Sequence, residues 1–189
     1  MKKIIFVLSL SVMAFSIQTF AQTKSEKVSA VSDGQMKNIL ALHGHMCAGL
    51  AIGIRVSQAA LREMGGNTFQ NELVAFVETD KCPVDAVQML VGTTAGKQNL
   101  IYEKKGKNVF TFVRRKDGKG VKITVKESQP DPTFNALREK KFAGTATKEE
   151  LERFEKMMDA RIETVLAASE SDLLTIEPIS VEVARVQRN

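Results

Sequence analysis

Residues 48–64, AGLAIGIRVSQAALREM, are the segment around which the rest of the fold is organised. Apolar side chains fall on nearly every face of a helix drawn through this stretch, which predicts a central buried helix. Gly49 and Gly53 are four residues apart on one face, where a missing side chain permits close approach by another backbone. Gly65 follows the stretch and is expected to end the helix.

The flanking segments predict a mixture of helices and strands. Further helices are expected from Gly34 to about His43, from Pro83 to Gly92, over Thr133–Lys141, and from a Thr147/Glu150 capping box to about Ala168. Strands are expected over Leu73–Val77, Leu100–Tyr102, Asn108–Arg115, Val121–Lys126 and, with an interruption at Pro178, Leu173–Val186. Because helices and strands do not alternate regularly, the predicted class is α+β. In this arrangement the central buried helix packs on a small mixed or antiparallel sheet, and a long amphipathic helix lies towards the C-terminus.

The first residues have the pattern of an export signal. Lys2 and Lys3 precede an apolar run over 4–15, and a small-x-small cleavage site ends at Ala21. We therefore expect a signal peptide over 1–21, a flexible leader over 22–32, one domain over 33–189, and a periplasmic or secreted location. The apolar run is too short to span a bilayer, and no later stretch approaches the roughly 20 apolar residues that a spanning helix needs.

The charge balance argues against a nucleic-acid partner. The full chain has a formal net charge of +5, and much of this excess lies between Lys104 and Lys126, where lysines alternate with strand-forming residues. That alternation is typical of a solvated sheet face. A nucleic-acid site would require a denser basic patch with stacking aromatic side chains.

The histidines and cysteines are the residues that carry chemistry. The chain has only two of each, and three of the four fall within HGHMC, residues 43–47, while Cys82 precedes another predicted helix. Imidazole and thiolate are ligands that zinc prefers. His45 and Cys47 would share a face if the stretch between them is extended. The candidate metal ligands are therefore His45, Cys47, Cys82 and His43.

The surroundings of these ligands suggest what such a site would do. A cysteine at the start of a helix is expected to have a lowered pKa. Asp85 and Asp80 are candidates for holding an imidazole in the required tautomer from outside the coordination sphere, although Asp85 also suits a first helical turn or direct ligation. Three protein ligands with an open position would favour exchange or reaction, whereas four would favour a structural site.

Three functions remain open from the residues alone. The preferred one is an exported protein that captures or handles a transition metal or a metal-containing cofactor. Zn²⁺ is the default ion, with iron, nickel, copper and haem iron as alternatives. A second is a metal-dependent enzyme in which Asp85 or Asp80 acts as the base. A third is a structural or interaction domain held by a Cys47–Cys82 disulfide, which an oxidising compartment permits.

Four motifs in order resemble the FmdE-like family, which is named for a component of formylmethanofuran dehydrogenase. The motifs are HGHMCAGL at 43–50, ETDKCPVDA at 78–86, GTTAGKQNL at 92–100 and NVFTF at 108–112. The resemblance covers about Met36 to Arg115. It implies an α+β core that pairs into a homodimer and a metal bound by His45, Cys47 and Cys82, with His43 and Asp85 beside them.

The chain departs from the family pattern at three points. Ala48 stands where the family usually has proline, and Thr93 stands where it usually has a cysteine that could serve as a soft ligand or redox partner. No cysteine follows Cys82, so the cysteine-rich zinc module that ends many members has no counterpart after it. The resemblance therefore concerns the core domain.

Overall fold

The computed structural model describes residues 31–66, 72–129 and 131–186. The predicted signal peptide, its cleavage site at Ala21 and nearly all of the predicted leader lie outside the described residues.

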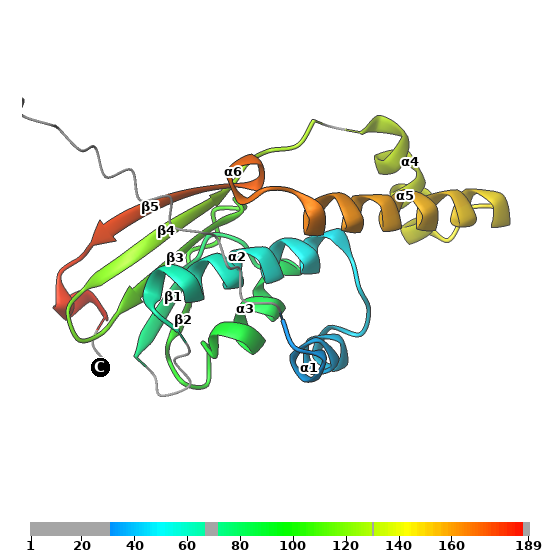
Figure 1. Cartoon of the computed structure of the whole chain (residues 1–189). Coiled ribbons are helices and arrows are strands. Elements are labelled where there is room, and N and C mark those ends of the chain that lie inside the picture. The colour runs from blue at the N-terminus through cyan, green and yellow to red at the C-terminus, as the bar shows by residue number, and fades with distance from the viewer. Residues whose placement is uncertain (1–30, 67–71, 130, 187–189) are drawn as a thin grey trace, which may run out of the picture.

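The described elements follow the predicted order closely (Figure 1). The helices are α1 Asp33–His43, α2 Ala48–Met64, α3 Pro83–Val91, α4 Pro132–Ala143, α5 Lys148–Ala167, α6 Glu170–Leu173 and the 3₁₀ helix η1 Val183–Val186. The strands are β1 Leu73–Val77, β2 Leu100–Tyr102, β3 Val109–Arg114, β4 Lys119–Val125 and β5 Leu174–Ser180.

One five-stranded sheet with the order β2-β1-β3-β4-β5 forms the base of the fold. The strands β1 and β2 are parallel, with Val77 opposite Tyr102, and the other neighbours are antiparallel. The helices α2 and α3 cover one face, where Val56 and Val87 pack with Phe110 and Phe112 in the main core. The structure thus confirms the α+β class, the mixed sheet and the central buried helix.

Two glycines allow α2 to lie directly against the start of α3. A Cβ atom on Gly53 would stand 2.3 Å from the carbonyl oxygen of Pro83, and one on Gly49 would stand 2.9 Å from Cβ of Cys82. Side chains at these positions would hold the two helices apart. The close approach predicted for this glycine pair is therefore confirmed, and it brings the first turns of α2 and α3 together.

The last predicted strand, Leu173–Val186, is wrong at both ends. Ser169 caps the short helix α6 through a hydrogen bond from the amide of Asp172, so β5 starts only at Leu174. At the other end, β4 begins at Lys119, and beyond Ser180 β5 therefore has no strand to pair with; the 3₁₀ turn η1 follows. The predicted interruption at Pro178 is also wrong, because Pro178 lies within β5 opposite Val121; it is tolerated there because β5 is an edge strand.

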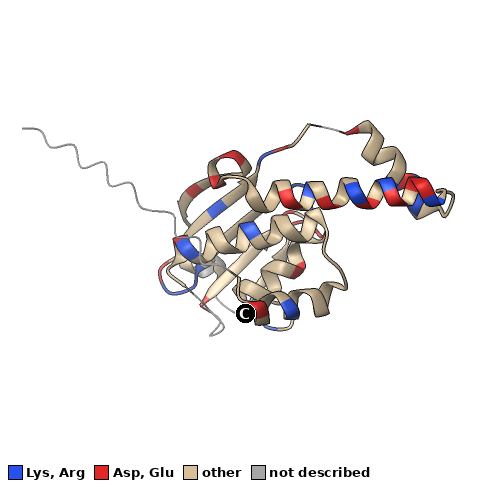
Figure 2. Cartoon of the chain, turned by 45° about the vertical axis from the view of Figure 1, so that its right-hand side comes forward, with Lys and Arg blue, Asp and Glu red and all other residues tan. Residues whose placement is uncertain are grey.

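The helices α4 and α5 extend away from the sheet (Figure 1), and acidic and basic residues are interspersed along α5 (Figure 2). Arg55 of α2 anchors the end of α5, since its guanidinium donates hydrogen bonds to three carbonyl oxygens there. The rings of Phe134 and Phe154 stack at 5.1 Å and join α4 to α5. The long C-terminal amphipathic helix is confirmed. Among the described residues, no helix is both long and apolar enough to cross a bilayer.

Candidate metal centre

The turn between α1 and α2 brings His43 and Cys47 together. His43 is the last residue of α1, and Gly44 follows it with a φ of +89°, a left-handed conformation that glycine adopts without strain. Cys47 then caps α2: its sulfur accepts a hydrogen bond from the amide of Leu50 at 3.3 Å. The Cys47 Sγ and His43 Nε2 atoms are 3.6 Å apart.

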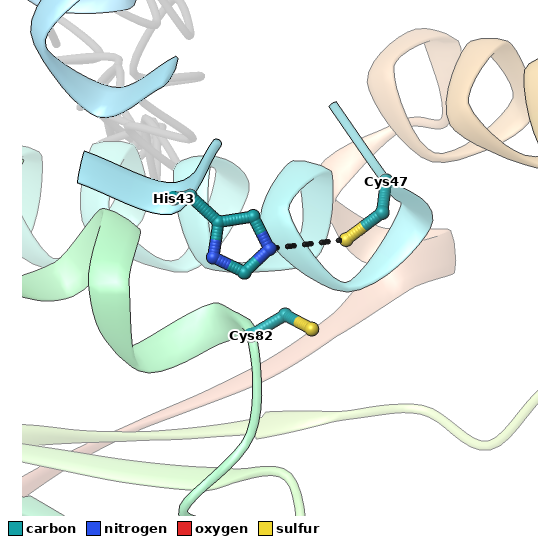
Figure 3. Close-up of side chains that lie close together, drawn as sticks. All are labelled: His43, Cys47 and Cys82. Atoms are coloured by element: carbon teal, nitrogen blue, oxygen red, sulfur yellow. Dashed lines mark hydrogen bonds between the residues drawn. The ribbon is translucent and has the colours of Figure 1, made fainter. Parts of the chain in front are cut away.

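Cys82 approaches the same point from the start of α3. It directly precedes Pro83, whose backbone lies against Gly53 of α2, so the glycine contact determines where the second sulfur lies. One ligand atom from each of His43, Cys47 and Cys82 lies within 4.8 Å of the others. Figure 3 shows the three side chains around a common space, and the group they form could hold a metal ion.

Asp85 determines which nitrogen of His43 faces the sulfurs. Its Oδ2 atom lies 2.7 Å from His43 Nδ1, in the first turn of α3. In a neutral imidazole the proton then sits on Nδ1 and is donated to the carboxylate, which leaves the lone pair on Nε2. Gln88 donates to the other carboxylate oxygen at 3.3 Å and fixes the orientation of the carboxylate. A carboxylate in this position is typical of histidines that ligate metals.

The distance between the Cys47 sulfur and the His43 nitrogen suits a tetrahedral ion. Zinc bonds of about 2.3 Å to sulfur and 2.0–2.1 Å to nitrogen place neighbouring ligand atoms about 3.6–3.8 Å apart in a tetrahedron. The observed distance between Cys47 Sγ and His43 Nε2 is 3.6 Å. Two sulfurs and one imidazole nitrogen are a donor set for zinc and other borderline or soft ions, and they leave a fourth position for water or another ligand.

The pKa of Cys82 shifts in the direction opposite to the one expected for a cysteine at a helix start. Burial raises the pKa of the Cys82 thiol, and the adjacent Cys47 raises it further. The reason is local: Cys82 itself has helical backbone angles, and its sulfur caps no amide of α3, in contrast to Cys47. Both cysteines are free in the structure. In the absence of an ion, Cys82 is therefore a protonated thiol at neutral pH, and metal binding must displace its proton.

Two of the predicted site residues lie outside this group. His45 is exposed, and its ring lies beside that of His43, with 5.0 Å between the ring centroids. Asp80 is also exposed, in the segment that joins β1 to Cys82. Neither belongs to the described three-residue cluster, so a role for His45 as a ligand and for Asp80 as an acceptor stays a prediction.

Tyr102 is a neighbour of the site that was not identified from the sequence. It ends β2, which runs parallel to β1, and alternation places it on the same face as the buried Leu100, the face that α3 covers. Burial raises the pKa of Tyr102, and the carboxylates of Asp85 and Asp80 raise it further. The strand pattern could have revealed it, because parallel neighbours end at the same edge of a sheet.

Thr93, the counterpart of a cysteine in the family pattern, is far from the candidate ligands. It follows Gly92 at the C-terminal end of α3, whereas Cys82 precedes the helix. The nine residues of α3 separate them by about 13 Å. Thr93 is fully buried, and its hydroxyl has no hydrogen-bond partner among the described residues. A cysteine at this position would not reach the ion held by this group.

Comparison with known proteins fits this arrangement. The chain matches the family described as "FmdE, Molybdenum formylmethanofuran dehydrogenase operon" over residues 42–175. The chain belongs to the FmdE family. The match includes the three clustered residues, and with them the whole of the sheet up to the start of β5.

Two individual proteins are similar to this chain, the first in sequence and the second in fold. A protein of Archaeoglobus fulgidus named "Probable S-adenosyl-L-methionine-binding protein" is 37% identical over 124 residues, which are 63% of this chain and 31% of that protein. The chain thus spans about a third of the length of this curated relative. The crystal structure of a tungsten formylmethanofuran dehydrogenase FmdE-like protein from Syntrophus aciditrophicus has a TM-score of 0.53 and 22% identity, with 82% of this chain and 76% of that one covered. This second likeness shows a shared fold.

Proposed function

We propose that this FmdE-family protein captures and hands on a transition metal ion, Zn²⁺ in the first place, after export from the cytoplasm. The observation that carries the proposal is the convergence of His43 Nε2 with the sulfurs of Cys47 and Cys82. Metal binding is supported by the donor set, and export by the N-terminal sequence pattern. Iron, nickel and copper are the alternative ions for the same donors, and a haem-bound iron is a further one.

Exchange of the ion, rather than a purely structural role, is supported by the number of donors. Three clustered ligands leave one coordination position open, and closed structural zinc sites use four. The case for hydrolytic chemistry is weaker at this site, because Asp85 is engaged by His43 and Gln88 and so is not placed as a free base. Asp80, which is exposed, is then the remaining candidate for the base of a metal-dependent enzyme.

Metal content and thiol state test the proposal. We expect protein purified without added metal, and then titrated with Zn²⁺, to bind about one equivalent per chain, the stoichiometry of a single tetrahedral site. Both thiols should react with a thiol reagent after denaturation. Cys82→Ser should abolish retention of the ion while circular dichroism stays unchanged. Absence of zinc binding, together with absence of free thiols, would instead support a Cys47–Cys82 disulfide.

A second candidate function comes from the curated relative and a surface cleft. The cleft, of about 540 Å³, lies between α2 and the ends of β3 and β4 and is lined by Ile52, Lys107 and Lys126. The amide of Lys107 donates to the carbonyl of Glu78, just after β1, so the cleft lies at the edge of the sheet from which Cys82 leaves. Lys126 Nζ donates a hydrogen bond to the carbonyl oxygen of Ser171 at 2.6 Å, so Lys107 is the lysine of the cleft that would bind the carboxylate of S-adenosyl-L-methionine. Isothermal titration of this compound, with Lys107→Gln as the variant, tests the candidate.

Location and assembly are the remaining parts of the proposal. Export predicts a mature protein that lacks residues 1–21, which mass spectrometry of the periplasmic or secreted fraction measures. The family resemblance supports a homodimer. Light scattering of the purified protein, with and without zinc, tests this.

A further inference from the structure

Two of the three clustered donors are poorly accessible to a hydrated ion, and Cys82 is partly exposed. Cys47 is 6% exposed, and the His43 side chain is 10% exposed. The ring of His43 is held between Asp85 on one side and Cys47 on the other. An incoming ion must shed water before it reaches Cys47 and His43, so an exposed donor close to the group would lower the barrier to both entry and departure.

His45 is an exposed donor in that position. It lies in the turn between α1 and α2, and its ring is 5.0 Å from that of His43 with an angle of 31° between the ring planes. Among the described residues, no hydrogen bond or ion pair fixes its imidazole, in contrast to that of His43. Gly44 on one side and the extended Cys47 on the other give a short tether that still permits rotation of the side chain.

We propose that His45 is an exchange ligand: it binds the ion first, passes it to His43, Cys47 and Cys82, and receives it again on release. This inference rests on the proposed function. A bond from the ion to His45 replaces one bound water. Bonds to His43 Nε2 and the two sulfurs then form, the thiol protons pass to solvent, and the bond to His45 breaks. The ion in the resting site keeps three protein ligands.

The rates of zinc association and release, measured together with the zinc affinity, distinguish an exchange ligand from a permanent ligand. Tyr102 is the only tyrosine and the chain has no tryptophan, so its fluorescence can follow Zn²⁺ binding beside Asp85 in a stopped-flow experiment. We expect His45→Gln to slow both zinc association and zinc release to a chelator by about tenfold, the effect of removing one tethered donor of millimolar effective concentration. The Kd should stay unchanged, because both rates fall together.

His45→Asp is the matched variant, since a carboxylate also binds zinc and should restore much of both rates at high salt, where simple charge attraction is screened. Cobalt(II) provides a second measurement: wild type and His45→Gln should give the same thiolate-to-cobalt absorption and ligand-field bands. Faster release with weaker affinity, or an altered cobalt spectrum, would show a permanent fourth ligand and overturn the inference. Unchanged rates would overturn it as well. Failure of the wild type to bind zinc would instead refute the proposed function.

Discussion

The contact between Gly53 and Pro83 makes the geometry of the metal site depend on helix packing. In Gly53→Ala the new Cβ would stand 2.3 Å from the Pro83 carbonyl oxygen and 2.7 Å from its Cα. Ordinary contacts between carbon and a carbonyl oxygen are about 3.3 Å or longer, so α2 and α3 must separate by roughly 1 Å. The obstructing atoms belong to the backbone, so no change of rotamer relieves the clash.

Two consequences follow for Gly53→Ala. Overpacking costs about 1–3 kcal/mol, and the better helix propensity of alanine offsets about 1 kcal/mol of it. We expect a net loss of up to about 2 kcal/mol, which corresponds to a drop in Tm of up to about 8 °C. Cys82 moves with Pro83 relative to Cys47, and a shift of about 1 Å exceeds the tolerance of about 0.2 Å for metal–ligand distances. Zinc affinity should therefore fall by about tenfold or more.

Two other glycines provide graded controls. A Cβ on Gly34 in α1 has no neighbouring atom within 4 Å, so Gly34→Ala should leave zinc affinity unchanged and raise stability by up to about 1 kcal/mol. A Cβ on Gly49 would stand 2.9 Å from Cβ of Cys82, an atom fixed to the backbone, so Gly49→Ala should displace Cys82, weaken zinc binding and lower Tm by less than Gly53→Ala does. Thermal melts and competition with a zinc chelator measure both quantities. If Gly53→Ala behaved like Gly34→Ala in both, the packing of α2 on α3 would not position the sulfurs.

Three further predictions concern single groups around the site. Asp85→Asn should weaken zinc binding by about 10–100-fold in a chelator competition, because His43 loses the carboxylate that fixes its tautomer, while circular dichroism stays unchanged. Thr93→Val should raise the free energy of unfolding in urea by about 1–2 kcal/mol, since it removes a buried hydroxyl without a partner among the described residues; a loss of stability would show that the hydroxyl is satisfied. Because burial raises the pKa of the Cys82 thiol, its proton competes with the ion below that pKa, and zinc affinity in pH-stepped titrations should rise up to about tenfold per pH unit from this thiol. The same raised pKa means that metal-free protein should lose stability as pH rises through it, since the unfolded chain releases this proton more easily.

Local signals account for the parts of the fold that could be predicted. The limits of α1 follow from the Ser32 and Gln35 capping box and from Gly44, and the start of α5 follows from the Thr147 and Glu150 box. In each case the residues that satisfy the free amides lie within four positions of the helix end, so neighbouring residues alone determine the boundary. The end of β5 depends instead on where β4 begins, a contact distant in the chain, and sequence reasoning placed it wrongly.

The candidate site also has one part that the sequence predicts and another part that depends on contacts distant in the chain. Sequence reasoning grouped two histidines and two cysteines, and the structure brings three of the four together. An extended turn would have placed His45 on one face with Cys47. In the structure His43 is still helical and Gly44 is left-handed, so His43 turns towards Cys47 and Asp85. The contact of His43 with Asp85 also depends on how α1 packs beside α3, which residues distant in the chain determine.

The packing around the sulfurs bears on whether this protein could release an ion and remain intact. Cys47 belongs to a buried apolar cluster with Ile39 and Leu50, which joins α1, α2 and α3 without any metal. Small zinc modules lack such a core and unfold when the ion is removed. We therefore expect the chelator-treated protein to keep its far-UV circular dichroism at 25 °C. At free zinc about 1,000 times the Kd, the ion should add about 4 kcal/mol to the stability of the folded state and raise Tm in proportion. Unfolding on chelation would place the ion in a structural role, because a carrier must survive the loss of its cargo.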